Sequence, residues 1–461
     1  MKRTKWLLCM CLIVALIVGE GAMVLTQATT SDVKLYRTGD VNDDGTVNSK
    51  DLVRMMKYFS QVEEVEVVEW ALDTTGDGRV NSKDLTRMQR YLSGTAELAE
   101  IELINAAKRA ELEAYLDTVS YLDFELTGDF EPYYLGRWFE KNVAGATHMM
   151  TVTDGSLLYF MTDGATEVRV NFTNITPSIA IPYFAYSIDG GAPVRQPIIA
   201  PTIYLPDSGM HTIRIIADGM TEGNGTPKWV NEEGFALKNI KVNSGAMYGI
   251  KPADKVIFYY GDSITEGINA LSNAANSTSN SATNAYSWFT SEYLGAAGYV
   301  IGHGGSGLTR TGSFSTMLNA IDKLSSTRNL SDHPNADITP DLIVVNHGAN
   351  DGLGGTDADT FEAALRETLA RLQQKYPGVT IIYVMPFMEE WQENVQSYSP
   401  RVDKVAAELE DIHVIHTDDW GLGRGLDNTT DSLHPNRAGA IKLATRLSSE
   451  ILKIVGNDFF K

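Results

Sequence analysis

Four short polar segments follow apolar runs in the second half of the chain: GDSITEG (261–267), HGGSG (303–307), GAND (348–351) and DSLHPN (431–436). Asp431 lies three residues before His434, so its carboxylate can accept the Nδ1 proton of the imidazole from the same turn. Nε2 is then free to take a proton from a serine hydroxyl, and Ser263 is the candidate. This relay is the machinery of nucleophilic acyl transfer.

The chain has eight histidines, which allows a choice among them. Only His434 combines a nearby upstream carboxylate with a position after the last predicted strand. The other histidines fit structural or surface roles better. His434 is therefore the predicted base.

The elements around these segments predict a parallel sheet. Apolar runs at 256–260, 299–302, 341–348 and 379–386 alternate with helical segments such as 358–376. Ligands of such sheets gather beyond the carboxyl ends of the strands, where the first three polar segments fall. One pocket is expected to collect all four.

Residues 255–461 resemble the SGNH (GDSL-type) hydrolase superfamily through Ser263, Asn350, His434 and Asp431 in these segments. The resemblance implies a three-layer α/β domain and an oxyanion hole. Its donors would be the amides of Ser263 and Gly307, with Gly305 as the alternative glycine, and the Asn350 side chain. The sequence departs from the family at Gly302, where the second block usually begins with Asn.

A second pattern is a tandem repeat near the N-terminus, in which residues 39–60 and 72–93 match at an offset of 33. Each copy has the spacing of a calcium-binding EF-hand loop, with oxygen ligands at alternate positions and a closing carboxylate. Position 7 offers only a backbone carbonyl. The predicted ligands are Asp40, Asn42, Asp44, Thr46 and Asp51 in the first loop and Asp73, Thr75, Asp77, Arg79 and Asp84 in the second.

The repeat resembles a type I dockerin, a small all-α module that binds two structural Ca²⁺ ions and docks enzymes onto the cohesins of a scaffold protein. The resemblance assigns cohesin recognition to loop positions 10 and 11, which are Ser49, Lys50, Ser82 and Lys83. Identical pairs in both copies suggest two near-equivalent docking faces. An intrachain calcium clip without a partner is the alternative.

Between the repeat and the hydrolase segments, short β-rich runs dominate from about 120 to 245, broken by DG, GG and PDSG turns. Regularly spaced strands of this kind predict a β-sandwich or jelly roll. A linker and helix are expected at 97–120. Exposed aromatics would suit sugar binding, but Trp138 and Trp229 fit a core better.

The N-terminus has Lys2, Arg3 and Lys5 before an apolar run, which predicts a signal peptide over 1–28, with an uncleaved anchor as the alternative. Both cysteines lie in it, so the mature chain is expected to lack disulfides. The formal net charge of −21 disfavours nucleic acid as a partner. No other stretch is long and apolar enough to cross a membrane.

The expected organisation is a signal peptide (1–28), dockerin (36–96), linker helix (97–120), β-sandwich (121–250) and hydrolase domain (251–461). A sandwich before an SGNH domain resembles carbohydrate esterase family 2, which removes acetyl groups from plant polysaccharides. The resemblance implies a secreted, cellulosome-associated acetylesterase acting on xylan first and glucomannan second, with no catalytic metal. Trp391 and Trp420 are candidates for stacking on sugar rings. A lipid, thioester or other short-chain ester hydrolase, and an inactive carbohydrate-binding relative, are the alternatives.

Overall fold

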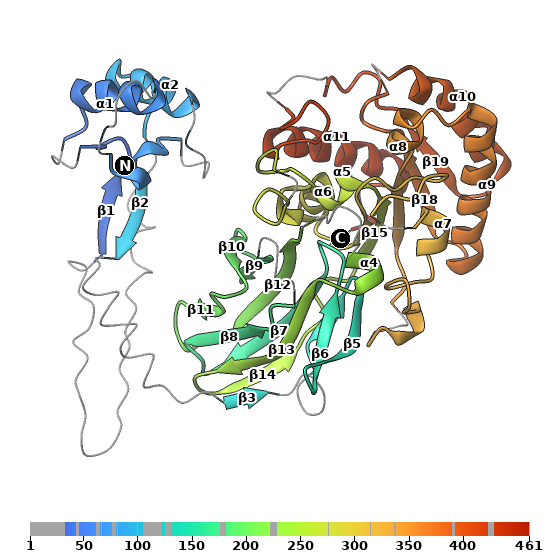
Figure 1. Ribbon diagram of the computed structural model, residues 1–461, viewed down its shortest axis with the longest axis horizontal. Helices are drawn as coiled ribbons and strands as arrows, with labels where there is room; N and C mark the ends of the chain where they lie inside the picture. Colours follow the sequence, from blue (N-terminus) through green and yellow to red (C-terminus); the bar gives the residue numbers. More distant parts are fainter. Residues whose placement is uncertain are drawn as a thin grey trace. The chain divides into compact units, whose positions relative to one another are not determined.

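The computed structural model describes residues 33–460 except 43–45, 61–64, 66, 76–79, 81, 99, 105–121, 125–130, 176–180, 222–227, 275, 314, 336–337, 390–391 and 423–427. The chain divides into two compact units, residues 1–120 and 121–461 (Figure 1). The predicted signal peptide lies outside the described residues. Within the described part, no helix combines the length and apolar character needed to span a bilayer.

The described part of the first unit contains β1 (Val33–Arg37), α1 (Ser49–Ser60), the 3₁₀ turn η1 (Glu69–Leu72), α2 (Ser82–Leu92) and β2 (Glu100–Ile104). The sequence repeat is also a packing repeat, because Met55 in α1 and Met88 in α2 are both fully buried. These two methionines share one small core with Val41, Ala71, Leu72 and Leu98.

Strands β1 and β2 pair antiparallel and flank the predicted all-α dockerin (36–96), overlapping it only at residues 36–37. Residues 100–104 lie in the segment expected to be linker and helix (97–120), but they form a strand. Its partner residues lie 63–71 positions earlier in the chain, with Val33 opposite Ile104 at one end of the ladder. The rest of that segment, residues 105–120, lies outside the described residues.

The second unit begins with two antiparallel sheets, here called the two-sheet domain (residues 122–249). Its elements are β3 (Leu122–Phe124), β4 (Tyr133–Leu135), β5 (Trp138–Val143), β6 (Ala146–Thr151), β7 (Leu157–Asp163), β8 (Glu167–Phe172), β9 (Tyr183–Ile188), β10 (Val194–Pro197), β11 (Thr202–Tyr204), β12 (His211–Gly219), α4 (Lys228–Asn231), β13 (Phe235–Val242) and β14 (Ala246–Gly249).

One sheet runs β10-β9-β12-β7-β14 with β4 beside β7, and the other runs β11-β8-β13-β6-β5 with β3 beside β13. Both contribute to one core, with Phe160 and Ile213 from the first sheet and Val170 and Leu237 from the second. The predicted DG turns lie where expected: Gly164 follows β7 and Gly190 follows β9, both with positive φ. Trp138 and Trp229 are buried in cores.

The hydrolase domain follows with β15 (Val256–Gly261), α5 (Ser263–Glu266), η2 (Ala282–Asn284), α6 (Tyr286–Leu294), β16 (Ala297–Gly302), α7 (Met317–Ala320), η3 (Leu330–Asp332), β17 (Leu342–Asn346), α8 (Ala349–Leu353), α9 (Ala358–Lys375), β18 (Thr380–Val384), α10 (Glu393–Glu408), β19 (Ile412–Ile415) and α11 (Arg437–Val455). Its strands form one parallel sheet in the order β16-β15-β17-β18-β19.

Helices cover both faces of this sheet (Figure 1). Successive residues of β15 show the alternation directly, because Phe258 packs into a core with Phe361 of α9. Its neighbour Ile257 packs into the opposite core with Leu447 of α11. The predicted α/β three-layer arrangement thus follows from strands that are buried on both faces.

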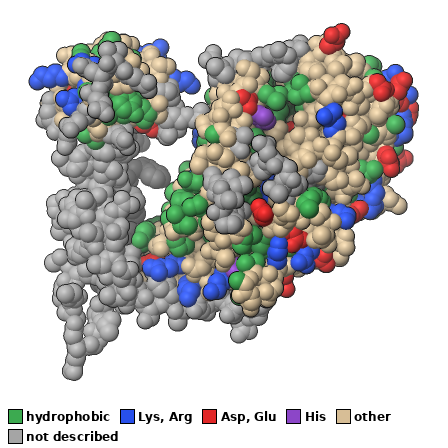
Figure 2. Space-filling model, in the orientation of Figure 1, with side chains coloured by type: hydrophobic (Ala, Val, Ile, Leu, Met, Phe, Trp, Pro, Cys, Tyr) green, Lys and Arg blue, Asp and Glu red, His purple; other side chains and the backbone are tan. Residues whose placement is uncertain are grey.

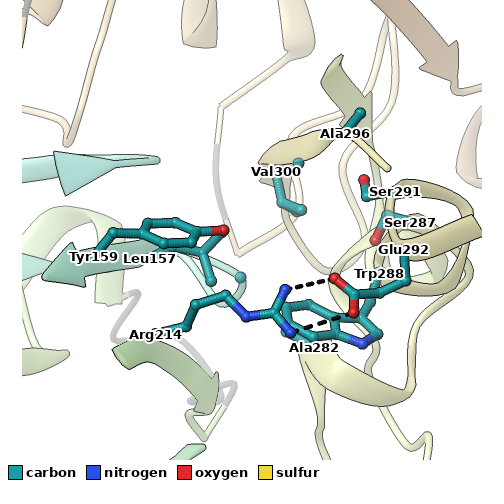
Figure 3. A pocket seen from close by; sticks show the side chains of 12 residues that line it. Leu157, Tyr159, Arg214, Ala282, Ser287, Trp288, Ser291, Glu292, Ala296 and Val300 are labelled. Atoms are coloured by element: carbon teal, nitrogen blue, oxygen red, sulfur yellow. Dashed lines mark hydrogen bonds and ion pairs between the residues drawn. The ribbon is translucent and has the colours of Figure 1, made fainter. Parts of the chain in front are cut away.

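The two-sheet domain and the hydrolase domain pack directly against each other. Figure 3 shows a pocket at this junction, lined by Leu157, Tyr159 and Arg214 on one side and by Trp288 and Glu292 of α6 on the other. The Arg214 guanidinium donates to both carboxylate oxygens of Glu292, at 2.6 and 3.2 Å. It also lies over the Trp288 ring, 5.0 Å from its centroid. The interface therefore combines a bidentate ion pair with aromatic packing.

Candidate active site

Strand register brings the polar segments to one edge of the parallel sheet. Gly261, the last residue of β15, stands opposite Gly302 at the end of β16 and Asn346 at the end of β17. The segments that follow these residues are the ones predicted to carry chemistry. Their convergence is thus set by hydrogen-bond register in the sheet.

Ser263 begins α5 directly after β15 and is 8% exposed. Gly261 permits this tight strand-to-helix junction, because a Cβ at this position would come 1.9 Å from Thr265 Oγ1. Asp262 caps the short helix by accepting a hydrogen bond from Ile264 N–H at 3.0 Å. The Ser263 hydroxyl is therefore held on a fixed backbone.

The structure brings the three residues of the predicted relay together. His434 Nε2 lies 3.0 Å from Ser263 Oγ, and His434 Nδ1 lies 2.7 Å from Asp431 Oδ2. Asp431 Oδ1 also accepts from the backbone N–H groups of Leu433 and His434, at 3.1 and 2.8 Å. One oxygen thus fixes the turn while the other faces the imidazole.

The charge state of Asp431 suits this arrangement. Burial alone would raise its pKa, but hydrogen bonds from the side chain and backbone of His434 lower the pKa well below the usual range. The carboxylate therefore stays ionised beside the imidazole, where it can stabilise an imidazolium.

Asn350, from α8, joins three of the polar segments. Its Nδ2 donates to Ser306 O at 3.0 Å and to Asp262 Oδ2 at 3.2 Å. The amide group is thus anchored next to the serine, and a ligand oxygen there would share or replace one of these bonds.

The glycine predicted for the oxyanion hole has a different partner in the structure. Gly307 N–H donates to Arg310 O at 3.0 Å within its own loop. Gly305, the alternative, has a φ of +71°. A ligand oxygen would compete with the Arg310 carbonyl for the Gly307 amide.

Asp351 is a supporting residue that sequence reasoning missed. It is fully buried and accepts from Leu308 N–H at 3.0 Å, Thr309 N–H at 2.8 Å and Thr309 Oγ1 at 2.6 Å. These bonds from Asp351 hold the loop of the HGGSG segment in place. The position of Asp351 directly after Asn350 in GAND was the sequence signal that could have found it.

Gly302 stands where the family usually has Asn. A Cβ at this position would come 2.8 Å from Glu266 N, so the backbone packing here requires glycine.

Asp262 was also missed as a site residue, although it lies inside GDSITEG. Burial raises its pKa to about 6, against the opposing hydrogen bond from Ile264 N–H. The Asp262 carboxyl accepts from Ile264 through Oδ1 and from Asn350 through Oδ2. A buried carboxyl with these two partners couples the serine junction to the Asn350 side chain.

In the first unit, the described part of each predicted calcium loop is hydrogen-bonded to its closing carboxylate. The closing residues Asp51 and Asp84 are fully buried at the starts of α1 and α2. Each reaches back to its own loop, with Asp51 Oδ1 accepting from Asn42 N–H at 3.3 Å and Asp84 Oδ1 from Thr75 N–H at 3.1 Å. Buried carboxylates facing a loop of oxygen donors fit a Ca²⁺ site. Asp44, Asp77 and Arg79 lie outside the described residues.

The predicted docking residues Ser49, Lys50, Ser82 and Lys83 are all exposed at the starts of α1 and α2. In Figure 2 the surface of this unit shows Lys and Arg side chains next to hydrophobic ones. Val53 and Met56 on α1 are exposed hydrophobic residues. Of the two tryptophans proposed to stack on sugar, Trp420 is buried and packs against Phe387, and Trp391 lies outside the described residues.

Comparisons with known families agree with this architecture. The GDSL-like Lipase/Acylhydrolase family matches residues 259–440, and the Dockerin type I domain matches residues 38–93. No curated protein matches the sequence at a significant level.

Among solved structures, a family two carbohydrate esterase from Cellvibrio japonicus is similar with a TM-score of 0.59 and 18% identity, covering 75% of this chain and 100% of that one. An acetyl xylan esterase from the rumen bacterium Butyrivibrio proteoclasticus has a TM-score of 0.56 and 15% identity, over 74% and 100% of the two chains. A salicylyl-acyltransferase of a tetracycline biosynthetic pathway is also similar, with a TM-score of 0.51 and 15% identity, over 73% and 98%.

The two esterase structures cover 75% and 74% of the chain, so most of the chain has a fold similar to that of the Cellvibrio japonicus family two carbohydrate esterase. At these identities the likeness concerns the fold. The family matches add the two domain types. The chain therefore contains a dockerin type I domain and a GDSL-like lipase/acylhydrolase domain, and it is a carboxylic ester hydrolase.

Proposed function

We propose that this protein is a secreted, cellulosome-associated acetylesterase that removes O-acetyl groups from plant cell-wall polysaccharide, with acetylated xylan as the first substrate and glucomannan as the second. The observation that carries the proposal is the unbroken relay Ser263–His434–Asp431, with contacts of 3.0 and 2.7 Å. The two-sheet domain would be a jelly-roll sandwich.

In the proposed mechanism, Ser263 Oγ attacks the acetyl carbonyl while His434 Nε2 takes its proton. The same nitrogen then donates this proton to the departing sugar oxygen, leaving an acetyl-serine. Water attacks the acetyl-serine with His434 again as base, which releases acetate and restores the hydroxyl. Asp431 orients the imidazole throughout.

Charge on the tetrahedral oxygen would be met by the amides of Ser263 and Gly307 and by Asn350 Nδ2. Each such donor contributes about 3 kcal/mol to transition-state stabilisation in serine hydrolases. Asn350 is the donor best supported here, because two bonds already hold its amide beside the serine junction.

Two observations support a polysaccharide as the substrate: the fold of the chain and the presence of a dockerin domain. The similar Butyrivibrio proteoclasticus protein is an acetyl xylan esterase, and another similar structure is of a Clostridium thermocellum family two carbohydrate esterase in complex with cellohexaose. A dockerin would place the enzyme on a cohesin-bearing scaffold outside the cell. Two Ca²⁺ ions would be held in the dockerin by the loop residues named above, and they would stabilise the docking helices.

Acetate release from acetylated xylan, glucomannan and pectin tests the proposal, with the wild type measured beside Ser263→Ala. We expect the wild type to release acetate from acetylated xylan and the Ser263→Ala variant to release none. Preference for long-chain acyl esters would instead favour a lipid hydrolase. Polysaccharide binding without acetate release would favour a non-catalytic binding protein.

A further inference from the structure

Asn269 lies outside the four polar segments, and it contacts Asp431 at the carboxylate end of the relay. Its Nδ2 donates to Asp431 Oδ2 at 2.8 Å, the same oxygen that His434 Nδ1 meets at 2.7 Å. Asn269 is 4% exposed and lies two residues after the GDSITEG segment. We propose that Asn269 is a positioning residue that fixes the Asp431 carboxylate toward His434, an inference that rests on the proposed function.

Both oxygens of the Asp431 carboxylate accept hydrogen bonds, and Asn269 donates to Oδ2. Oδ1 is held by two backbone N–H groups of its own turn. Together with His434 Nδ1, the Asn269 amide restrains Oδ2 against rotation about χ2 of Asp431. A neutral amide donor restrains this oxygen without neutralising it, whereas a cation would compete with the imidazolium for the charge.

Asn269 is itself held in place. Its φ is +54°, a left-handed conformation in which Asn and Gly are favoured. Its N–H donates to Asn280 Oδ1 at 3.0 Å, and Asn280 Nδ2 donates to Met220 O of the two-sheet domain at 2.8 Å.

The two-sheet domain also clamps the rest of this loop, through Asp218 at the end of β12. Asp218 is fully buried and accepts from Ser281 Oγ at 2.9 Å and from Thr283 N–H at 2.8 Å. Arg195 pairs with Asp218 at 2.5 Å and donates to Asn280 O at 2.9 Å. The position of the Asp431 carboxylate is thereby tied to the neighbouring domain through Asn269.

The test is Asn269→Gly, which keeps a residue suited to positive φ but removes the amide. We expect kcat on a soluble acetyl ester to fall about tenfold with KM unchanged, as for loss of one hydrogen bond to a charged group. The control is Ser272→Gly, a change to glycine at an exposed position of the same loop, which should leave kcat within twofold. Combined with Asp431→Asn, the Asn269→Gly change should cost less than a further twofold, since its partner is already altered.

A kcat within twofold of the wild type, or an equal loss in both backgrounds, would overturn the inference. Labelling of Ser263 by a fluorophosphonate probe provides a second readout that needs no polysaccharide. Failure on every acetylated substrate with normal labelling would therefore reject the proposed function but not the role of Asn269. If Asn269→Gly does not fold, Asn269→Asp replaces it, and its added charge beside Asp431 should slow labelling more than tenfold.

Discussion

Lys228 of the two-sheet domain forms a buried ion pair with Glu266, which lies three residues after Ser263 in the GDSITEG segment. The two side chains are 2% and 1% exposed, and Lys228 Nζ also lies 3.5 Å from Asp154 Oδ2. The ion pair thus anchors α5, the helix that begins at Ser263, to the two-sheet domain. Neither domain is expected to keep this geometry alone.

Lys228→Met should destabilise the protein strongly, because it leaves two buried carboxylates without their shared cation. We expect the free energy of unfolding to fall by about 3–5 kcal/mol, measured by urea denaturation. The matched control is Lys453→Met, whose pair with Glu450 is exposed and should contribute less than about 1 kcal/mol. A similar small change in both variants would contradict this account.

The relay predicts a specific ranking of activities. Ser263→Ala and His434→Ala should each lower kcat by at least about four orders of magnitude, and Asp431→Asn should do the same or slightly less, because the amide favours the wrong imidazole tautomer. Acetate release measures the effect, with thermal melting as the folding control. Near-normal activity of His434→Ala would contradict the proposed role of His434 as the general base.

Asp262 predicts a pH dependence of stability. Its folded-state pKa of about 6 lies above the unfolded value of about 3.9, so between these values the folded protein binds more protons than the unfolded chain. The stability that Asp262 contributes is therefore present near pH 4 and is lost as pH rises through 6.

Asp262→Asn removes this titration. The stability of the variant relative to the wild type should increase by about 2 kcal/mol between pH 4 and pH 7, because each pKa unit of difference corresponds to about 1.4 kcal/mol and the unfolded carboxyl is half-ionised near pH 4. Urea denaturation across this range measures the difference. The exposed Asp419→Asn serves as control, and a parallel pair of curves for Asp262→Asn and the wild type would refute the prediction.

Calcium removal should separate the two proposed activities. A chelator, or Asp51→Asn combined with Asp84→Asn, should abolish pull-down by a cohesin because the docking helices lose their loop anchors. Hydrolysis of a soluble acetyl ester should continue. Ser263→Ala is the reciprocal control, which should keep cohesin binding. Equal loss of both activities on chelation would contradict this division.

Sequence pattern predicted the domain types and the order of the catalytic segments well. Apolar strands bounded by polar motifs place those motifs at the carboxyl edge of a parallel sheet, and the family and dockerin matches confirm both domain types. Asp431 and His434 were predictable as a pair because three residues separate them within one turn. Their catalytic roles remain predictions.

The segment after the dockerin shows where local pattern was insufficient. Residues 100–104 were expected in linker and helix but pair as a strand with Val33–Arg37, because partners distant in sequence can override local propensity. The oxyanion-hole role of Gly307 was taken from the family resemblance and stays a prediction, and in the structure its N–H donates to Arg310 O.

The chain's own sequence determined which hydroxyl, imidazole and carboxylate are available and which strands precede the polar segments, because hydrophobic periodicity and short spacings are local properties. Only the tertiary structure decided that Asn269 meets Asp431, that Asp351 holds the Thr309 loop and that Lys228 meets Glu266. These contacts join residues 38–162 positions apart, and no local rule specifies such partners. They form when register and domain packing bury the polar groups together, where each must find a partner.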